Sequence, residues 1–195
     1  MGKTALSPVI CLIGPTASGK TALAFALADR YPVHLISVDS AQIYRGMNIG
    51  TAKPDAATLA RYPHALIDIL DPEEPYSAGR FATDARREIA AAHARGQIPV
   101  LVGGTMLYYH TLYTGIDDLP AADPANRARI EARLAAEGSA ALHAELARLD
   151  PQTAATIKPN DRQRLVRALE LILTSGQTPS ALYAAQQTRR PPWPT

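Results

Sequence analysis

The sequence predicts an α/β fold, in which a parallel sheet is flanked by helices and followed by an all-helical appendage. Short apolar runs alternate with helical patterns through the first part of the chain, which is typical of a parallel sheet covered by helices. After residue 119 no further strand pattern occurs, and only helix starts follow. We therefore expect an α/β core over residues 1–119, a helical appendage over 120–190 and a short tail over 191–195.

Four apolar runs are expected to form the strands of the core. They cover residues 9–13, 34–40, 65–70 and 98–104. Helices are expected after the first, third and fourth runs, over residues 20–30, 79–95 and 105–113, and only the last follows its strand directly. Ser77 is expected to cap the second of these helices, and Gly96 follows its end. The segment between the second and third strands is expected to be irregular.

The helices of the appendage are expected to begin at good N-cap residues, twice with proline at the first helical position. These starts are Asp123-Pro124, Ser139, Asp150-Pro151 and Asn160. The last helix has an apolar stripe made of Leu165, Ala168, Leu169 and Ile172. Gln163 and Arg167 lie opposite that stripe and Arg164 lies on its flank, so the pattern predicts a polar, basic face that points away from the core. The proline-rich end, which contains Trp193, is typical of a linker.

Composition limits the class of protein and of partner. The 195 residues are 47% hydrophobic and carry a formal net charge of +2, so a nucleic-acid partner requires a local basic patch. Cys11 is the only cysteine, so an internal disulfide is excluded. It lies in an apolar run, which indicates a small buried side chain. No apolar run of about 18 residues occurs, and the N-terminus lacks a basic leader with a cleavage site. We therefore expect a cytoplasmic monomer without a membrane partner.

The segment GPTASGKT has the spacing of a phosphate-binding loop between a strand and a helix. Its residues are Gly14, Pro15, Thr16, Ala17, Ser18, Gly19, Lys20 and Thr21. The glycines allow successive N–H groups to converge on phosphate oxygens, and the helix start adds a positive end. Lys20 can reach the terminal phosphates, and the Thr21 hydroxyl is placed to bind Mg²⁺. The loop makes the predicted core P-loop NTPase-like, but the motif does not identify the molecule whose phosphates it binds.

A nucleotide-hydrolysing enzyme normally carries a metal-binding acid at the end of a later apolar strand. The run IPVLV ends in Gly-Gly-Thr instead. Asp68 and Asp71 lie in or beyond another run, so either can replace that acid. The missing acid weakens the nucleotide interpretation without excluding it.

Asp39 begins a dense polar segment, DSAQIYRGMNIGTAKP, near the carboxyl end of the second predicted strand. Ligands of open α/β sheets bind beyond the carboxyl ends of strands, where the phosphate loop also lies. A carboxylate at this place can bind a metal, act as a general base or cap a turn. Capping is the commoner role of a lone aspartate, but the polar residues that follow favour a functional role.

Several motifs together resemble the tRNA dimethylallyltransferase family. Besides GPTASGKT they are VDSAQIYRGMNIGTAKP (38–54), PHALIDI (63–69), YSAGRF (76–81) and VGGTMLYYH (102–110). The most specific is DSAQIYRGMNIGTAKP, which nucleotide kinases do not carry. The resemblance spans about residues 8–190 and implies transfer of a dimethylallyl group from dimethylallyl diphosphate to N6 of the adenine 3′ of the anticodon, in tRNAs that read codons beginning with U.

The resemblance also implies the functional residues. Asp39 is the general base and Thr105 a second catalytic residue, while the phosphate loop and Mg²⁺ hold the diphosphate leaving group. The tRNA contacts implied are Asp39, Ser40, Ala41, Gln42, Thr105, Arg127, Gln163, Arg164, Leu165, Val166 and Arg167. The partners are thus the anticodon stem-loop of tRNA and dimethylallyl diphosphate.

The family pattern continues beyond this chain with further helices, which include an arginine that helps to hold the diphosphate. Activity of the 195 residues alone is therefore in question. Two other functions stay open: a P-loop kinase that transfers phosphate from ATP to a small molecule or nucleoside, and an inactive RNA-binding fragment. Transfer of the isoprenoid to free AMP is disfavoured by the basic appendage.

Overall fold

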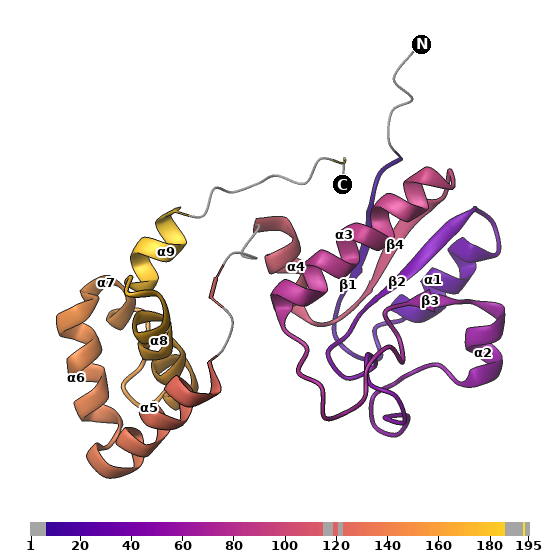
Figure 1. Ribbon diagram of the computed structural model, residues 1–195. Coiled ribbons are helices and arrows are strands. Elements are labelled where there is room, and N and C mark those ends of the chain that lie inside the picture. Colours follow the sequence, from indigo (N-terminus) through magenta and orange to yellow (C-terminus); the bar gives the residue numbers. More distant parts are fainter. Residues whose placement is uncertain (1–6, 115–118, 121–122, 186–192, 194–195) are drawn as a thin grey trace. The chain divides into compact units, whose positions relative to one another are not determined.

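A computed structural model of the chain describes residues 7–114, 119–120, 123–185 and 193 (Figure 1). The chain divides into two compact units. One comprises Met1–Asp117 with Thr188–Thr195, and the other comprises Asp118–Gln187. Trp193, expected in a linker, is 9% exposed and belongs to the main apolar cluster of the first unit.

The first unit contains a four-stranded parallel sheet in the order β1-β4-β2-β3. The strands are β1 (Ile10–Ile13), β2 (Val33–Val38), β3 (His64–Ala65) and β4 (Ile98–Gly103). The helices are α1 (Lys20–Ala28), α2 (Ala56–Arg61), α3 (Ala78–Ala94) and α4 (Met106–Thr114). The parallel sheet with flanking helices confirms the predicted fold class.

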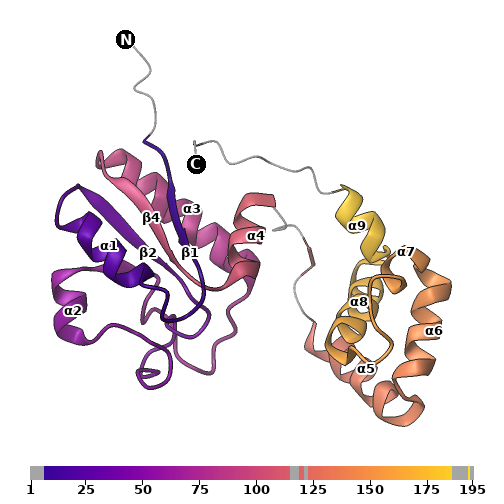
Figure 2. The same ribbon diagram turned by 180° about the vertical axis from the view of Figure 1, so that it is seen from behind.

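Alternation along the strands distributes the apolar side chains between the two faces of the sheet. Ile36, Val38 and Leu101 pack in the cluster that includes residues of α3 and α4. Leu35 and Val100 pack instead with Ala24 of α1. Figures 1 and 2 show the resulting layers, with α3 and α4 on one face and α1 on the other. The tyrosines Tyr108 and Tyr109 of α4 are buried in the same cluster as α3.

The third predicted strand is largely wrong. Of residues 65–70 only Ala65 lies in a strand, because Leu66 and Asp68 adopt left-handed backbone angles, with φ of 65° and 53°. The following residues pair with the segment after β2: the Asp68 amide donates to the Gln42 carbonyl at 3.1 Å, and the Arg45 amide donates to the Leu70 carbonyl at 2.8 Å.

The segment expected to be irregular contains a short helix that the prediction missed. The Asp55 carboxylate accepts the Thr58 amide at 2.7 Å and caps the N-terminus of α2. This is a standard N-cap arrangement, although Pro54 and the short apolar run make the helix hard to see in the sequence.

The described residues of the second unit form helices joined by turns, without a strand among them. Its helices are α5 (Pro124–Glu137), α6 (Ser139–Leu149), α7 (Pro151–Ala154), α8 (Arg162–Ser175) and α9 (Pro179–Ala185). Asp123 and Asp150 cap α5 and α7 as expected. Gly138 caps α6, one residue before the predicted Ser139. Asp161 caps α8, one residue after the predicted Asn160. Helix α9 was not predicted.

Within the described ranges, no helix is both long and apolar enough to cross a bilayer.

Candidate active site at the carboxyl edge of the sheet

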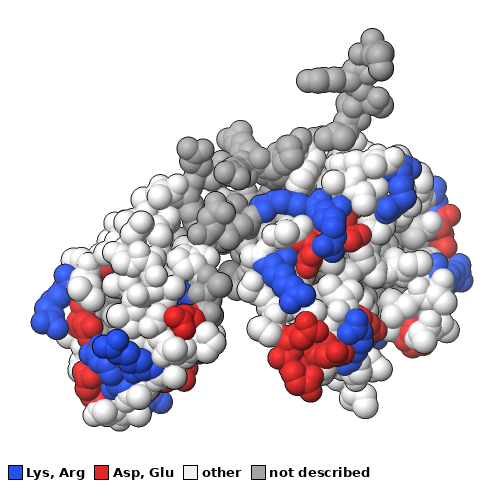
Figure 3. Space-filling model, viewed as in Figure 1, with Lys and Arg blue, Asp and Glu red and all other residues white. Residues whose placement is uncertain are grey.

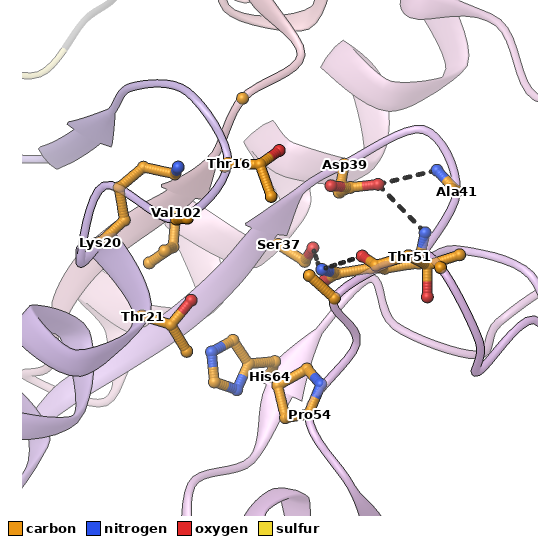
Figure 4. Close-up of a pocket in the computed structure, with 16 residues that line it drawn as sticks. Thr16, Lys20, Thr21, Ser37, Asp39, Ala41, Thr51, Pro54, His64 and Val102 are labelled. Carbon is orange, nitrogen blue, oxygen red and sulfur yellow. Dashed lines mark hydrogen bonds between the residues drawn. The ribbon is translucent and has the colours of Figure 1, made fainter.

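A cavity of about 270 Å³ lies where the phosphate loop, the segment after β2 and the end of β4 meet (Figure 4). Its lining comes from segments far apart in the sequence, which converge because the strands are parallel and end at the same edge. The lining residues are Thr16, Ala17, Lys20, Thr21, Ser37, Asp39, Ala41, Gln42, Gly50, Thr51, Ala52, Pro54, His64, Val102, Gly103 and Gly104. Asp39 and the phosphate loop are thus brought into one cavity.

The phosphate loop connects β1 to α1, which is the context that its motif requires. Ala17 and Gly19 have left-handed φ angles of 64° and 84°, so the loop turns tightly before α1 begins at Lys20. The first turn of α1 carries no acidic residue, and its N-terminus is therefore open to an anion. The Lys20 ammonium donates to the Pro15 carbonyl and to Ser18 Oγ at 3.3 Å, so this side chain lies along the loop.

Asp39 both caps a turn and faces the cavity. Its Oδ1 accepts the Ala41 amide at 2.8 Å and the Gln42 amide at 3.2 Å. Figure 4 shows the other carboxylate oxygen on the side of Thr16 and Lys20, away from these two amides. The backbone bonds therefore orient the carboxylate and leave Oδ2 to act on a bound group.

Gln42 is held at both ends of its side-chain amide. Ser37 Oγ donates to Gln42 Oε1 at 3.1 Å, and Gln42 Nε2 donates to the Thr51 carbonyl at 3.1 Å. Gln42 is partly buried, and a polar side chain with both groups satisfied keeps a single orientation. Of the residues predicted to surround the substrate base, Ala41 and Gln42 line the cavity, whereas the lining does not include Ser40.

Thr105 joins the end of β4 to the Asp39 turn. Its Oγ1 accepts the amide of Ser40 at 3.2 Å, and its own amide donates to the Val38 carbonyl at 3.3 Å. The carbonyl of Thr105 also accepts the Tyr108 amide at 3.0 Å at the start of α4. The hydroxyl itself positions the residue that follows Asp39.

Gly103, the last residue of β4, has no room for an acidic side chain. A Cβ at this position would lie 2.0 Å from the Val38 carbonyl oxygen, so β4 and β2 approach too closely for any side chain. Asp68 does not take the acid's place: it pairs with Lys53, and the residues that line the cavity do not include it. Asp71 pairs with Arg45 at 3.0 Å.

His64 lines the cavity and is also held by a hydrogen bond and a ring contact. Its Nδ1 lies 2.7 Å from the Tyr62 carbonyl, and its ring meets Phe25 edge to face. A carbonyl can only accept, so Nδ1 carries the proton and Nε2 is left as an acceptor. Burial lowers the pKa of His64 below 6.5, which favours the neutral ring.

The predicted tRNA-contacting residues of the helical unit differ in exposure. The side chain of Arg164 is 72% exposed and that of Arg127 is 45% exposed, and Gln163 is exposed as well. Leu165 and Val166 lie in the core of the unit, so they present no side-chain surface. Leu165 fulfils the other prediction made for it, since it belongs to the buried apolar stripe of α8.

The helical spacing predicted that Arg167 points away from the core, but the structure shows that its side chain is held by other groups of the unit. It donates to the Pro120 carbonyl at 2.8 Å and lies 3.3 Å from the carboxylate of Glu170, which is 1% exposed. A buried carboxylate requires a charged partner, and that requirement turns the arginine inward.

Charges over α5 are mixed rather than uniformly basic. Figure 3 shows basic and acidic side chains side by side on the visible face of the helical unit. Arg127 pairs with Glu131 at 2.9 Å, and Arg133 pairs with Glu137 at 2.8 Å. Such exposed pairs are weak and can be exchanged for contacts with phosphate.

Comparisons with known proteins agree with the cavity. The sequence profile of the IPP transferase family matches residues 42–195, and that of the isopentenyl transferases matches residues 7–71. The chain belongs to the IPP transferase family. Two curated relatives named tRNA dimethylallyltransferase, from Dechloromonas aromatica (strain RCB) and Dichelobacter nodosus (strain VCS1703A), are 56% and 58% identical to it.

The matches to these IPP transferase relatives cover 99% and 96% of this chain but 62% and 59% of the relatives. Solved structures show the same relation. The tRNA isopentenylpyrophosphate transferase of Bacillus halodurans is 43% identical, with a TM-score of 0.54, and the match covers 89% of this chain and 57% of that one. A eukaryotic dimethylallyltransferase acting on tRNA is 29% identical, with a TM-score of 0.77 over 94% of this chain and 46% of its own.

A divalent metal is generally expected in this family. The cavity is suited to a metal ion that is held partly by the protein and partly by the phosphates of the substrate. Among the described residues, no group of three or more His, Cys, Asp or Glu side chains forms a metal site. The Thr21 hydroxyl and the Asp39 carboxylate do line the same cavity, beside the phosphate loop. Mg²⁺ is commonly held by one or two protein groups together with phosphate oxygens. The donor set present here is therefore suited to a metal that enters with a diphosphate.

Proposed function

We propose that this chain carries the catalytic site of a tRNA dimethylallyltransferase. The proposed reaction moves a dimethylallyl group from dimethylallyl diphosphate to N6 of the adenine 3′ of the anticodon. One observation carries the proposal: Asp39 lines the same cavity as the phosphate loop. A leaving diphosphate and a base for the incoming amine are the two requirements of this transfer, and they come from these two segments.

In the proposed reaction the allylic C–O bond of the donor breaks and a C–N bond to the adenine amine forms. The departing diphosphate gains charge, which the loop amides, the N-terminus of α1 and Lys20 stabilise. Mg²⁺, when bound through Thr21 and the phosphate oxygens, would add further charge neutralisation. The phosphates are thus held as a leaving group.

Asp39 is the proposed general base. The exocyclic amine of adenine is a weak nucleophile because its lone pair is delocalised into the ring, so loss of its proton must accompany C–N bond formation. The Asp39 oxygen that is not bonded to the Ala41 and Gln42 amides is available to accept that proton. Thr105 keeps this turn in place through Ser40, and the held amide of Gln42 offers a fixed polar group to the adenine.

Transfer to tRNA requires the adenine to leave its stack and enter the cavity. We propose that Arg127, Gln163 and Arg164, all exposed on the helical unit, contact the RNA backbone. We also propose that the protein acts as a monomer in the cytoplasm, where tRNA is found; sedimentation of the purified chain tests the monomer.

The test is to incubate the chain with labelled dimethylallyl diphosphate or with labelled ATP, each with and without tRNA. The proposal expects label in RNA only from the isoprenoid donor. Transfer of phosphate from ATP to a small molecule would establish the kinase function instead. RNA binding without any transfer would support the inactive fragment. An Asp39→Asn variant is the matched control, because it keeps the backbone bonds of the turn.

A further inference from the structure

The segment that follows β2 carries an isoleucine that is almost fully exposed. Ile49 is 96% exposed, and Met47 is 40% exposed. Single exposed apolar residues are ordinary on protein surfaces, but they are usually partly covered by their neighbours. Ile49 instead lies in the segment between β2 and α2, the tip segment, which forms a loop that projects from the α/β unit in Figure 1.

Hydrogen bonds within the loop hold this tip in one conformation. Thr51 Oγ1 donates to the Met47 carbonyl at 2.9 Å, and the Asn48 amide donates to the Gly46 carbonyl at 2.9 Å. Gly46 and Gly50 provide the left-handed turns on either side, with φ of 74° and 77°. An apolar side chain presented by a braced loop is already arranged for contact, which reduces the entropy lost on binding.

The tip adjoins the cavity on the side of the proposed base. Gly50, Thr51 and Ala52 line the cavity directly after Ile49. The Thr51 carbonyl accepts Gln42 Nε2, and Figure 4 shows Thr51 beside the Asp39 turn and across the cavity from Lys20. Ile49 therefore directly precedes the wall of the cavity that faces Lys20 from the side of the Asp39 turn.

We propose that Ile49, supported by Met47, is an apolar wedge that packs against a nucleobase next to the acceptor adenine. The inference rests on the proposed function, because RNA that delivers an adenine to Asp39 must place the adjoining nucleotides beside this wall. Withdrawing one base exposes the faces of its neighbours, at a cost of a few kcal/mol. Apolar side chains inserted at such a step cover the exposed faces and stabilise the opened RNA.

The experiment uses an anticodon stem-loop in which 2-aminopurine replaces the nucleotide beside the acceptor adenine. Unstacking raises the fluorescence of this probe, and its titration also yields the dissociation constant. The wild-type chain is expected to bind and to change the fluorescence. Ile49→Ser should weaken binding about 10-fold, in the range measured for loss of one base contact, and reduce the fluorescence change.

Two further variants control for a general loss of structure. Ile49→Leu keeps an apolar side chain at the tip and should bind like the wild type. Tyr31→Ser removes another exposed side chain, 55% exposed, which precedes β2 at the opposite end of the strand, and it should also bind like the wild type.

Several results would overturn the inference. Ile49→Ser could bind the RNA as tightly as the wild type, or all three variants could lose affinity equally. Loss of affinity for dimethylallyl diphosphate alone would place the isoprenoid against Ile49 instead of a base. If Ile49→Ser changes only the sedimentation of the chain, the tip contacts protein. A wild-type chain that binds no stem-loop would refute the RNA part of the proposed function itself, which distinguishes that failure from failure of the wedge.

Discussion

The ammonium of Lys53 lies 2.5 Å from the carboxylate of Asp68, although its own side chain is only 2% exposed. It also donates to the Tyr44 carbonyl at 2.6 Å. Asp68 in turn uses its amide to bind the Gln42 carbonyl. One buried charge therefore ties together the segment that contains Gln42 and the turn that replaced the third predicted strand. The lysine of the GTAKP motif is a structural support for the cavity wall.

This pair should respond asymmetrically to substitution. Asp68→Asn leaves a buried ammonium without its counter-charge, and we expect it to lower the free energy of unfolding by about 3 kcal/mol, at the lower end for broken buried pairs. Lys53→Met leaves a carboxylate that is 39% exposed and can be hydrated, so we expect a smaller loss of about 1–2 kcal/mol. Urea denaturation of the two variants measures both; a larger loss for Lys53→Met would contradict this account.

Gly103 should not tolerate even a methyl group. Gly103→Ala would place Cβ 2.0 Å from the Val38 carbonyl oxygen at the carboxyl ends of the two strands, which must separate β2 from β4 there. We expect a loss of stability at or above the upper end of the about 1–3 kcal/mol seen for overpacking. Gly104→Ala is the matched control, because its nearest contact is 3.2 Å away, at Gly14 O. Equal denaturation midpoints for the two variants would be inconsistent with the close strand approach.

Two substitutions of Asp39 separate its capping role from its proposed role as a base. An asparagine side chain would keep an oxygen for the Ala41 and Gln42 amides, so Asp39→Asn should fold normally and bind the diphosphate, while transfer falls about 10²–10⁴-fold. Asp39→Ala should also lose about 1 kcal/mol of stability with the lost hydrogen bonds. Single-turnover transfer and thermal denaturation provide the two readouts. Normal turnover by Asp39→Asn would exclude the carboxylate as the base.

His64 should make the stability of the α/β unit depend on pH. Its folded-state pKa is lowered below 6.5 by burial, so below pH 6.5 the unfolded chain takes up a proton that the folded chain does not. The free energy of unfolding should therefore fall as the pH decreases from 6.5 towards the lowered pKa, with no contribution above pH 6.5. Urea denaturation at pH 7.5 and 5.5 should show a smaller difference for His64→Phe than for the wild type. Equal differences for His64→Phe and the wild type would contradict the burial of a neutral His64.

The two arginines of α8 should have different effects. Arg167→Ala removes the partner of a carboxylate that is 1% exposed, and should destabilise the helical unit by about 3–5 kcal/mol. Arg164→Ala should leave stability within about 0.5 kcal/mol, since its side chain is 72% exposed. Under the proposed function, Arg164→Ala should instead weaken tRNA binding and reduce the dependence of affinity on salt. An unchanged salt dependence of tRNA affinity would show that Arg164 does not contact the RNA backbone.

Local patterns were sufficient for the elements whose own residues decide their structure. Glycine spacing between an apolar run and helix formers identified the loop from Gly14 to Thr21. The sequence identified strands β1, β2 and β4, because burial on both faces of a parallel sheet makes such strands continuously apolar. It identified helices α1, α3 and α4 by their helical pattern. The prediction failed at residues 66–70, where pairing with residues 42–45 and the charge of Lys53 outweigh an apolar composition.

The sequence by itself determined that a phosphate-binding loop, an aspartate after the second strand and a helical region occur in one chain. It also showed that no acid follows the fourth strand. Only the tertiary structure decided that Asp39 and the loop line one cavity, that Gly103 has no room for a side chain and that Arg167 turns toward Glu170. The physical reason is that these relations depend on contacts between residues remote in the chain, where strand convergence and the desolvation of buried charge take effect.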